Sequence, residues 1–173
     1  MHVAVFGSST ISPGDPWYAA GIDLGRGIAG LGLPVATGGY GGMMEAVSRG
    51  AAEAGGRVIG VTAPGLFPHR GEANRWVDEE ITTTSIAERI GMLVEGAVAA
   101  VAMPGALGTL TELAVSWNEV YINGSDGLAV CTVGEAWATF VAEYAPILGA
   151  PAPTCVETSE DAIRWLTRLQ SRL

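Results

Sequence analysis

Short apolar runs alternate with amphipathic segments along this chain. The runs are rich in β-branched residues and are too short to be buried helices, so we predict that they are strands with both faces covered. The predicted strands are His2–Phe6, Pro34–Thr37, Arg57–Val61, Ile81–Thr84, Ala97–Met103 and Leu128–Val133.

The segments between these runs carry apolar residues at helical spacing, and their ends carry helix-stop and capping residues. Ser85 with Glu88 has the pattern of a capping box, Pro146 is expected to end a helix, and Ser159 is expected to cap the last one. The intervening residues 62–80 lack a period and are predicted to form an irregular loop. The predicted helices are Trp17–Leu31, Met43–Ala54, Ser85–Glu95, Thr109–Val120, Ala136–Tyr144 and Ser159–Leu173.

Alternation of buried strands with helices is typical of an α/β fold. We therefore predict a single Rossmann-like domain over residues 1–173, a doubly wound parallel sheet with helices on both faces. In such sheets ligands bind at the carboxyl ends of the strands.

Composition narrows the classes of function. The chain has 173 residues and a net charge of −9, and it contains no lysine, so no basic face for nucleic acid is expected. Its apolar runs are too short to cross a membrane, which favours the cytoplasm. Cys131 and Cys155 can form neither a disulfide framework nor a zinc cluster, and each is expected to be a small buried residue. We expect no metal and no organic cofactor.

Three glycine-containing turns follow predicted strands and precede predicted helices. Backbone N–H groups in such turns, together with the positive end of the next helix, can hold a phosphate. An ordinary tight turn is the alternative interpretation. The candidate binding residues are Gly7, Ser8 and Ser9 in the first turn, Gly38, Gly39, Gly41, Gly42, Met43 and Glu45 at the second, and Pro104, Gly105, Gly108 and Thr109 in the third.

Several of these residues also have a purely structural interpretation. Thr109 and Glu112 form a T-x-x-E sequence, which is a capping box as readily as a ligand site. Glu45 favours a helix N-terminus through the helix dipole. Arg89, on a predicted helix, has the alternative of a solvated surface charge. His69 and Arg70 lie in a proline-flanked loop that either covers a site or is plain surface.

These motifs together resemble the LONELY GUY family of cytokinin-riboside-monophosphate phosphoribohydrolases, many of whose members once carried the name lysine decarboxylase. They also resemble the related molybdenum-cofactor carrier proteins. The likeness runs from about residue 3 to residue 120. It includes the G-S-S turn, the glycine turn with Met-Glu, an arginine helix, and P-G-A-L-G-T-L-T-E at residues 104–112 against the family signature P-G-G-x-G-T-x-x-E.

The resemblance implies a Rossmann-like fold, and a catalytic arginine and acid at the positions of Arg89 and Glu112. It implies cleavage of the N-glycosidic bond of a nucleoside 5′-monophosphate, with release of free base and ribose 5-phosphate. It also implies a homodimer or higher homo-oligomer. Lysine decarboxylation is excluded, because pyridoxal-phosphate chemistry needs a Schiff-base lysine.

A second hypothesis is a carrier or sensor that binds a nucleotide or the molybdenum cofactor without turnover. Three departures from the cytokinin branch motivate it. Ala106 stands at the second glycine of the signature, Ile90 stands where cytokinin-activating members have lysine, and the turn from Gly38 to Glu45 is closer to the carrier branch. Both hypotheses share a small phosphorylated ligand.

Overall fold

The computed structural model describes residues 1–124 and 127–171, and a parallel sheet lies at its centre. In these residues seven strands are ordered β4-β3-β2-β1-β5-β6-β7, and every neighbouring pair is parallel. The strands are β1 (His2–Phe6), β2 (Val35–Thr37), β3 (Val58–Thr62), β4 (Glu79–Thr82), β5 (Ala97–Ala102), β6 (Ala129–Val133) and β7 (Thr154–Val156).

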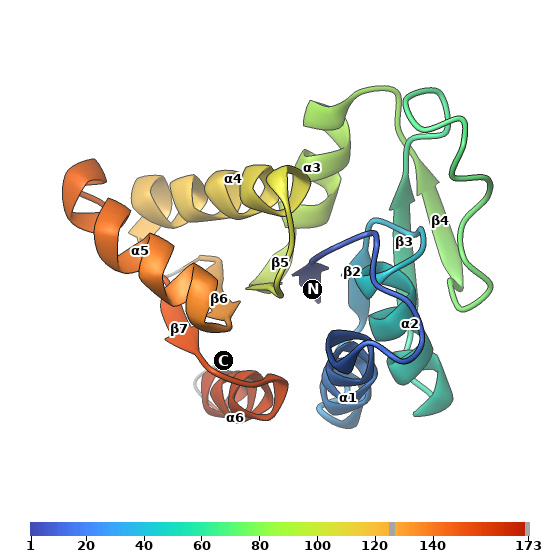
Figure 1. Ribbon diagram of the computed structural model, residues 1–173, viewed down its shortest axis with the longest axis horizontal. Coiled ribbons are helices and arrows are strands. Elements are labelled where there is room, and N and C mark those ends of the chain that lie inside the picture. The colour runs from blue at the N-terminus through green and yellow to red at the C-terminus, as the bar shows by residue number, and fades with distance from the viewer. Residues whose placement is uncertain (125–126, 172–173) are drawn as a thin grey trace.

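Helices cover both faces of this sheet (Figure 1). One face is covered by α1 (Pro16–Gly30), α2 (Met43–Glu53) and α6 (Ser159–Gln170), and the other by α3 (Ile86–Val94), α4 (Leu107–Asn123) and α5 (Glu135–Leu148). The predicted fold class, a doubly wound Rossmann-like α/β sheet, is confirmed.

Residues 3–6 of strand β1 are all apolar because both faces of the strand are covered by helices. Val3 and Val5 pack with α1, α2 and α6, whereas Ala4 and Phe6 pack with α3, α4 and α5. All four side chains are buried because successive residues of a strand point to opposite faces. The hydrophobic gain for a fully buried valine or phenylalanine is about 1.5–3 kcal/mol each.

Helices α1 and α2 approach each other through glycines. A Cβ at Gly25 would overlap the carbonyl oxygen of Val47, and a Cβ at Gly50 would overlap that of Ile22. Both glycines are therefore needed for the close packing of this helix pair. This contact holds the start of α2 beside the carboxyl end of β1.

The sheet changes winding direction between β1 and β5. After edge strand β4 the chain crosses through α3 to β5, which pairs with β1. The turns after these two strands are joined, since the Ser8 N–H donates to the Pro104 carbonyl at 3.0 Å and the Met103 N–H donates to the Phe6 carbonyl at 2.9 Å. The carboxyl ends of β1 and β5 thus form the switch point at which such sheets bind ligands.

Two helix-end predictions are wrong. Pro146 does not end α5, which continues to Leu148 and stops at Gly149, a residue in the left-handed conformation (φ 61°). A proline in the last turn costs one backbone hydrogen bond, and here the left-handed glycine gives the stop. The last helix is capped by Thr158 and not by Ser159, since Thr158 Oγ1 accepts from the Asp161 N–H at 3.1 Å. The predicted end of this helix at residue 173 lies outside the described residues.

Smaller differences concern edges of the sheet. Strand β4 begins at Glu79, two residues before its predicted start, and the predicted loop therefore ends earlier. Strand β7 was not predicted. Cys131 is buried as expected, but Cys155 on β7 is exposed, which contradicts its predicted burial. Among the described residues no helix is long and apolar enough to cross a membrane.

Candidate active site

A cavity of about 440 Å³ opens at the switch point between β1 and β5. Its walls come from the turn after β1, the start of α2, the β3–β4 loop (residues 63–78), α3 and the first two turns of α4. Eight predicted site residues line it: Gly7, Ser8, Ser9, Gly38, Arg89, Gly108, Thr109 and Glu112.

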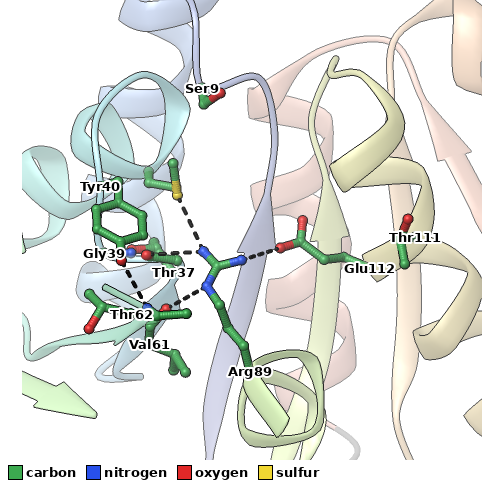
Figure 2. Close-up of polar contacts among 12 residues, drawn as sticks. Ser9, Thr37, Gly39, Tyr40, Val61, Thr62, Arg89, Thr111 and Glu112 are labelled. Carbon is green, nitrogen blue, oxygen red and sulfur yellow. Dashed lines mark hydrogen bonds and ion pairs between the residues drawn. The ribbon is translucent and has the colours of Figure 1, made fainter. Parts of the chain in front are cut away.

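The side chain of Arg89 lines this cavity and is fixed by hydrogen bonds to two backbone carbonyls. It projects from α3, whose N-terminus is capped by Ser85 as predicted. Its side chain is only 8% exposed, so the alternative of a solvated surface charge is wrong. Its Nε donates to the Val61 carbonyl at 2.8 Å and its Nη2 donates to the Gly38 carbonyl at 3.0 Å (Figure 2). The remaining nitrogen, Nη1, lies on the side of Glu112.

Gly38 makes room for this guanidinium group. A Cβ at this position would overlap Nη2 of Arg89 and would lie 2.6 Å from Sδ of Met44. The glycine is therefore required by the arginine that enters the turn. Burial lowers the pKa of Arg89, but an arginine side chain remains protonated at neutral pH.

Glu112 is the acid that faces Arg89 across the cavity. Its Oε1 lies 3.4 Å from Nη1 of Arg89, longer than the 2.7–2.9 Å typical of a charge-assisted hydrogen bond. The other carboxylate oxygen points away from Arg89 in Figure 2. Burial raises the pKa of Glu112 to about 7, although the positive charges of Arg89 and Arg70 oppose the rise. The carboxyl group is therefore poised to exchange a proton near neutral pH.

Of the two interpretations of Thr109 and Glu112, the capping box is wrong, because the helix begins two residues before Thr109. Helix α4 starts at Leu107 after Ala106, and no side chain caps it. Thr109 is buried and packs against Gly105. A Cβ at Gly105 would collide with the Thr109 hydroxyl group. The uncapped start of α4 presents its positive dipole end where Gly108 lines the cavity.

The glycine turn before α2 contributes less to the cavity than predicted from its sequence. Gly42 (φ 72°) is needed because a Cβ would meet the backbone of Ser8 and Ser9, and the Met43 N–H is taken by the Ser8 carbonyl at 2.8 Å. The first donor of α2 is thus used inside the protein. The predicted residues that do not line the cavity are Gly39, Gly41, Gly42, Met43, Glu45, Pro104 and Gly105, and a ligand contact for them stays a prediction.

An aromatic pair that the sequence pattern did not indicate lies beside Arg89. The rings of Tyr40 and Phe67 meet edge to face at 6.0 Å, and the guanidinium carbon of Arg89 lies 5.9 Å and 5.8 Å from their centroids. Phe67 and Arg70 line the cavity from the β3–β4 loop. Of these two residues, only Arg70 was considered in the sequence analysis, in a loop that either covers a site or is plain surface. The part of the chain that the structure describes holds no group of three potential metal ligands.

Comparisons by sequence identify related proteins. The model of the SLOG cluster4 family matches residues 1–122. A cytokinin riboside 5′-monophosphate phosphoribohydrolase from Mycobacterium marinum is 36% identical over 103 residues, which cover 60% of this chain and 54% of that protein. A probable enzyme of the same name from Oryza sativa is 30% identical over 125 residues, 70% of this chain and 50% of that protein. The matched regions thus span about half the length of these curated relatives.

Comparisons by structure identify the same fold. The molybdenum cofactor binding protein from Rippkaea orientalis matches with a TM-score of 0.77 at 24% identity, over 97% of this chain and 96% of that one. The molybdenum cofactor carrier protein from Chlamydomonas reinhardtii matches with a TM-score of 0.74 at 24% identity, over 98% of both chains. At this identity the likeness establishes the fold alone.

Proposed function

The chain belongs to the SLOG cluster4 family, and from this premise we propose that it hydrolyses the N-glycosidic bond of a nucleoside 5′-monophosphate, releasing free base and ribose 5-phosphate. The observation that carries the proposal is the facing pair of Arg89 and Glu112, enclosed in one cavity at the switch point of the sheet.

Glu112 supplies the group that the reaction needs at the sugar. Cleavage passes through an oxocarbenium-like state, which a nearby carboxylate stabilises. Water then adds at C1′, the bonding electron pair leaves with the base, and the proton lost by the water is taken up by the base. A carboxyl group whose pKa is about 7 is ionised in a substantial fraction of molecules at neutral pH, so it can stabilise the positive charge and orient the water.

Arg89 and the start of α4 supply the positive potential that the phosphate needs. Two nitrogens of Arg89 are fixed to backbone carbonyls, so the guanidinium group is already in position before a ligand binds. The uncapped N-terminus of α4, at Leu107 and Gly108, adds backbone donors at the same cavity. The two features together suit a phosphate group, with the sugar of the same ligand placed toward the Glu112 carboxylate.

A second candidate function is binding of a phosphorylated ligand without turnover. Ala106 favours it, because this residue lines the cavity directly before the uncapped start of α4. Its methyl group occupies a position where the signature of the resembled family has glycine. A methyl group there restricts how closely a phosphate approaches the helix.

Detection of free base separates the two functions. Purified protein is incubated with a panel of purine and pyrimidine nucleoside 5′-monophosphates and with the matching nucleosides, and free base is measured by chromatography. We expect release from monophosphates only, reduced about 10²–10⁴-fold in Glu112→Gln. The matched control is Glu119→Gln, which changes a carboxylate of the same helix outside this cavity and should retain activity.

The pH dependence gives a second test of the role of Glu112. If the carboxylate is the active form, kcat/KM rises with pH through about 7, the pKa of the buried carboxyl group. No release by the wild-type protein, together with thermal stabilisation by a nucleotide, would favour binding without turnover. Neither release nor stabilisation would remove both functions.

The proposal includes a homo-oligomer. Helix α4 exposes large apolar side chains, with Leu107 75%, Ile122 65% and Tyr121 57% exposed. A second copy of the chain packed against this helix would bury these side chains. Light scattering of the purified protein measures the mass directly, and a monomer would contradict this part of the proposal.

A further inference from the structure

Arg70 is a cation at the edge of the cavity that the proposed reaction has not used. It lies in the β3–β4 loop and lines the same cavity as Arg89 and Glu112. Its guanidinium carbon lies 4.5 Å from the centroid of the Phe67 ring, and Nη2 lies 3.4 Å from the Ser9 hydroxyl oxygen. The side chain therefore bridges from its own loop to the turn after β1.

The loop that carries Arg70 is fixed at both sides of this residue. Phe67 packs edge to face on Tyr40 before it. After it, Asn74 donates from its backbone N–H to the Gly39 carbonyl at 2.7 Å, and from Nδ2 to the Tyr40 carbonyl at 3.0 Å. Arg70 is thus an exposed side chain on an anchored loop, close to the turn that it reaches.

No acidic partner neutralises Arg70 within the described residues, where no carboxylate oxygen lies within 4.0 Å of it. Arg26, Arg49 and Arg164 each pair with an acid on their own helix. Within the described residues Arg75 and Arg168 are exposed without such a partner, as Arg70 is, but unlike Arg70 they do not line the cavity. In a protein with a net charge of −9, an arginine that lines a cavity and has no carboxylate oxygen within 4.0 Å is available to an anion.

Arg70 and Arg89 share one aromatic pair and repel each other. Tyr40 lies 5.4 Å from the guanidinium carbon of Arg70 and 5.9 Å from that of Arg89, and Phe67 is close to both. The charge of Arg70 contributes to lowering the pKa of Arg89 and opposes the rise in the pKa of Glu112. Two cations and one partly ionised acid leave the cavity with net positive charge. A phosphate monoester, with about −1.5 to −2 charge at pH 7, has the complementary charge.

We infer that Arg70 is a phosphate-binding residue that contacts the 5′-phosphate of the ligand from the β3–β4 loop, on the same side of the cavity as the aromatic pair that it shares with Arg89. This assignment rests on the proposed ligand class, a nucleoside 5′-monophosphate, and does not require turnover. It gives the β3–β4 loop a function, since the loop positions a ligand contact and also covers the cavity beside Ser9.

The test compares Arg70→Gln with Arg75→Gln in the same loop. Arg75 is also exposed and also stacks on an aromatic ring, with its guanidinium carbon 4.6 Å from the Trp76 centroid, but it does not line the cavity. Calorimetry measures binding of AMP, ribose 5-phosphate, inorganic phosphate and adenosine to each protein. We expect Arg70→Gln to weaken AMP and ribose 5-phosphate about 10–100-fold while adenosine is unchanged, because only charged contacts are lost. Arg75→Gln should bind like the wild type.

Several results would overturn the inference. One is that Arg70→Gln binds AMP as tightly as the wild type, and another is that it loses as much affinity for adenosine as for AMP. A third is that Arg75→Gln loses as much AMP affinity as Arg70→Gln does. The last is that the wild type binds none of the phosphate probes. Arg70→Lys gives a further check: it keeps the charge but loses the planar fork, and should fall between wild type and Arg70→Gln. The outcome is separable from the proposed reaction. If the wild type releases no base, Arg70→Gln can still weaken AMP binding, which would support the inference without the reaction. If the wild type releases base and Arg70→Gln keeps the same KM for AMP, the reaction stands and the inference fails.

Discussion

Replacing Glu112 with glutamine tests the electrostatics of the site without any ligand. Glutamine keeps the shape and an oxygen acceptor toward Arg89, but it cannot ionise. The carboxyl group is 12% exposed, and burial raises its pKa to about 7 in the folded protein. In the unfolded chain its pKa is near 4.5, so the folded state binds the proton more tightly.

The sign and size of the effect follow from this difference. A carboxyl group with a raised pKa contributes its full stabilisation below pH 4.5 and loses it as the pH rises through 7, since the folded state resists ionisation longer than the unfolded state does. Between pH 5 and pH 8 the wild type should lose about 2.5 kcal/mol of unfolding free energy relative to Glu112→Gln.

Urea unfolding of both proteins at pH 5, 6, 7 and 8 measures this difference. All other titrating groups are common to the two proteins, so their contributions cancel in the comparison. The difference should grow in favour of the variant from pH 5 to pH 7 and should level off toward pH 8. A difference that stays constant from pH 5 to pH 8 would refute the raised pKa.

Two further predictions concern glycines. Gly38→Ala should displace the guanidinium group of Arg89, because the added methyl group overlaps it, and should reduce AMP affinity in calorimetry at least tenfold; unchanged affinity would mean that the turn can adjust. Gly50→Ala should lower the unfolding free energy measured in urea by about 1–3 kcal/mol, because the new methyl group meets the backbone of Ile22. Gly91→Ala is the control. This position is exposed on a helix and has open space around the new Cβ, so the substitution should raise the unfolding free energy by about 0.5–1 kcal/mol.

The sheet was predictable because its strands are buried on both faces. In a segment such as residues 3–6 every side chain is buried, so every position is apolar. Strand β7 gives the contrast. It has three residues, Thr154–Val156, and it lies at the edge of the sheet with two exposed positions, so burial imposes no pattern on it. Local sequence also could not separate the two interpretations of Thr109, since a T-x-x-E sequence fits a cap and a buried threonine equally well.

The site was predictable in part, and for a different reason. Arg89 and Glu112 were identified through a resemblance, whereas their burial depends on partners distant in the chain. Arg89 binds the carbonyls of Val61 and Gly38, which are 28 and 51 residues away. Backbone carbonyls leave no mark in the sequence. Phe67 and Arg70 lie in an aperiodic loop, where only the fold brings them to the cavity.

The attachment of Arg89 to two strand ends has an evolutionary consequence. Because this side chain supplies hydrogen-bond donors to the Val61 and Gly38 carbonyls, its loss would leave buried acceptors unpaired whatever the protein binds. A lineage that abandoned catalysis would still be under selection to keep the arginine for stability. Within the part of the chain that the structure describes, the Glu112 carboxylate accepts no backbone hydrogen bond, and its buried charge opposes folding above neutral pH. Loss of the Glu112 carboxylate would therefore cost the fold less than loss of the Arg89 side chain.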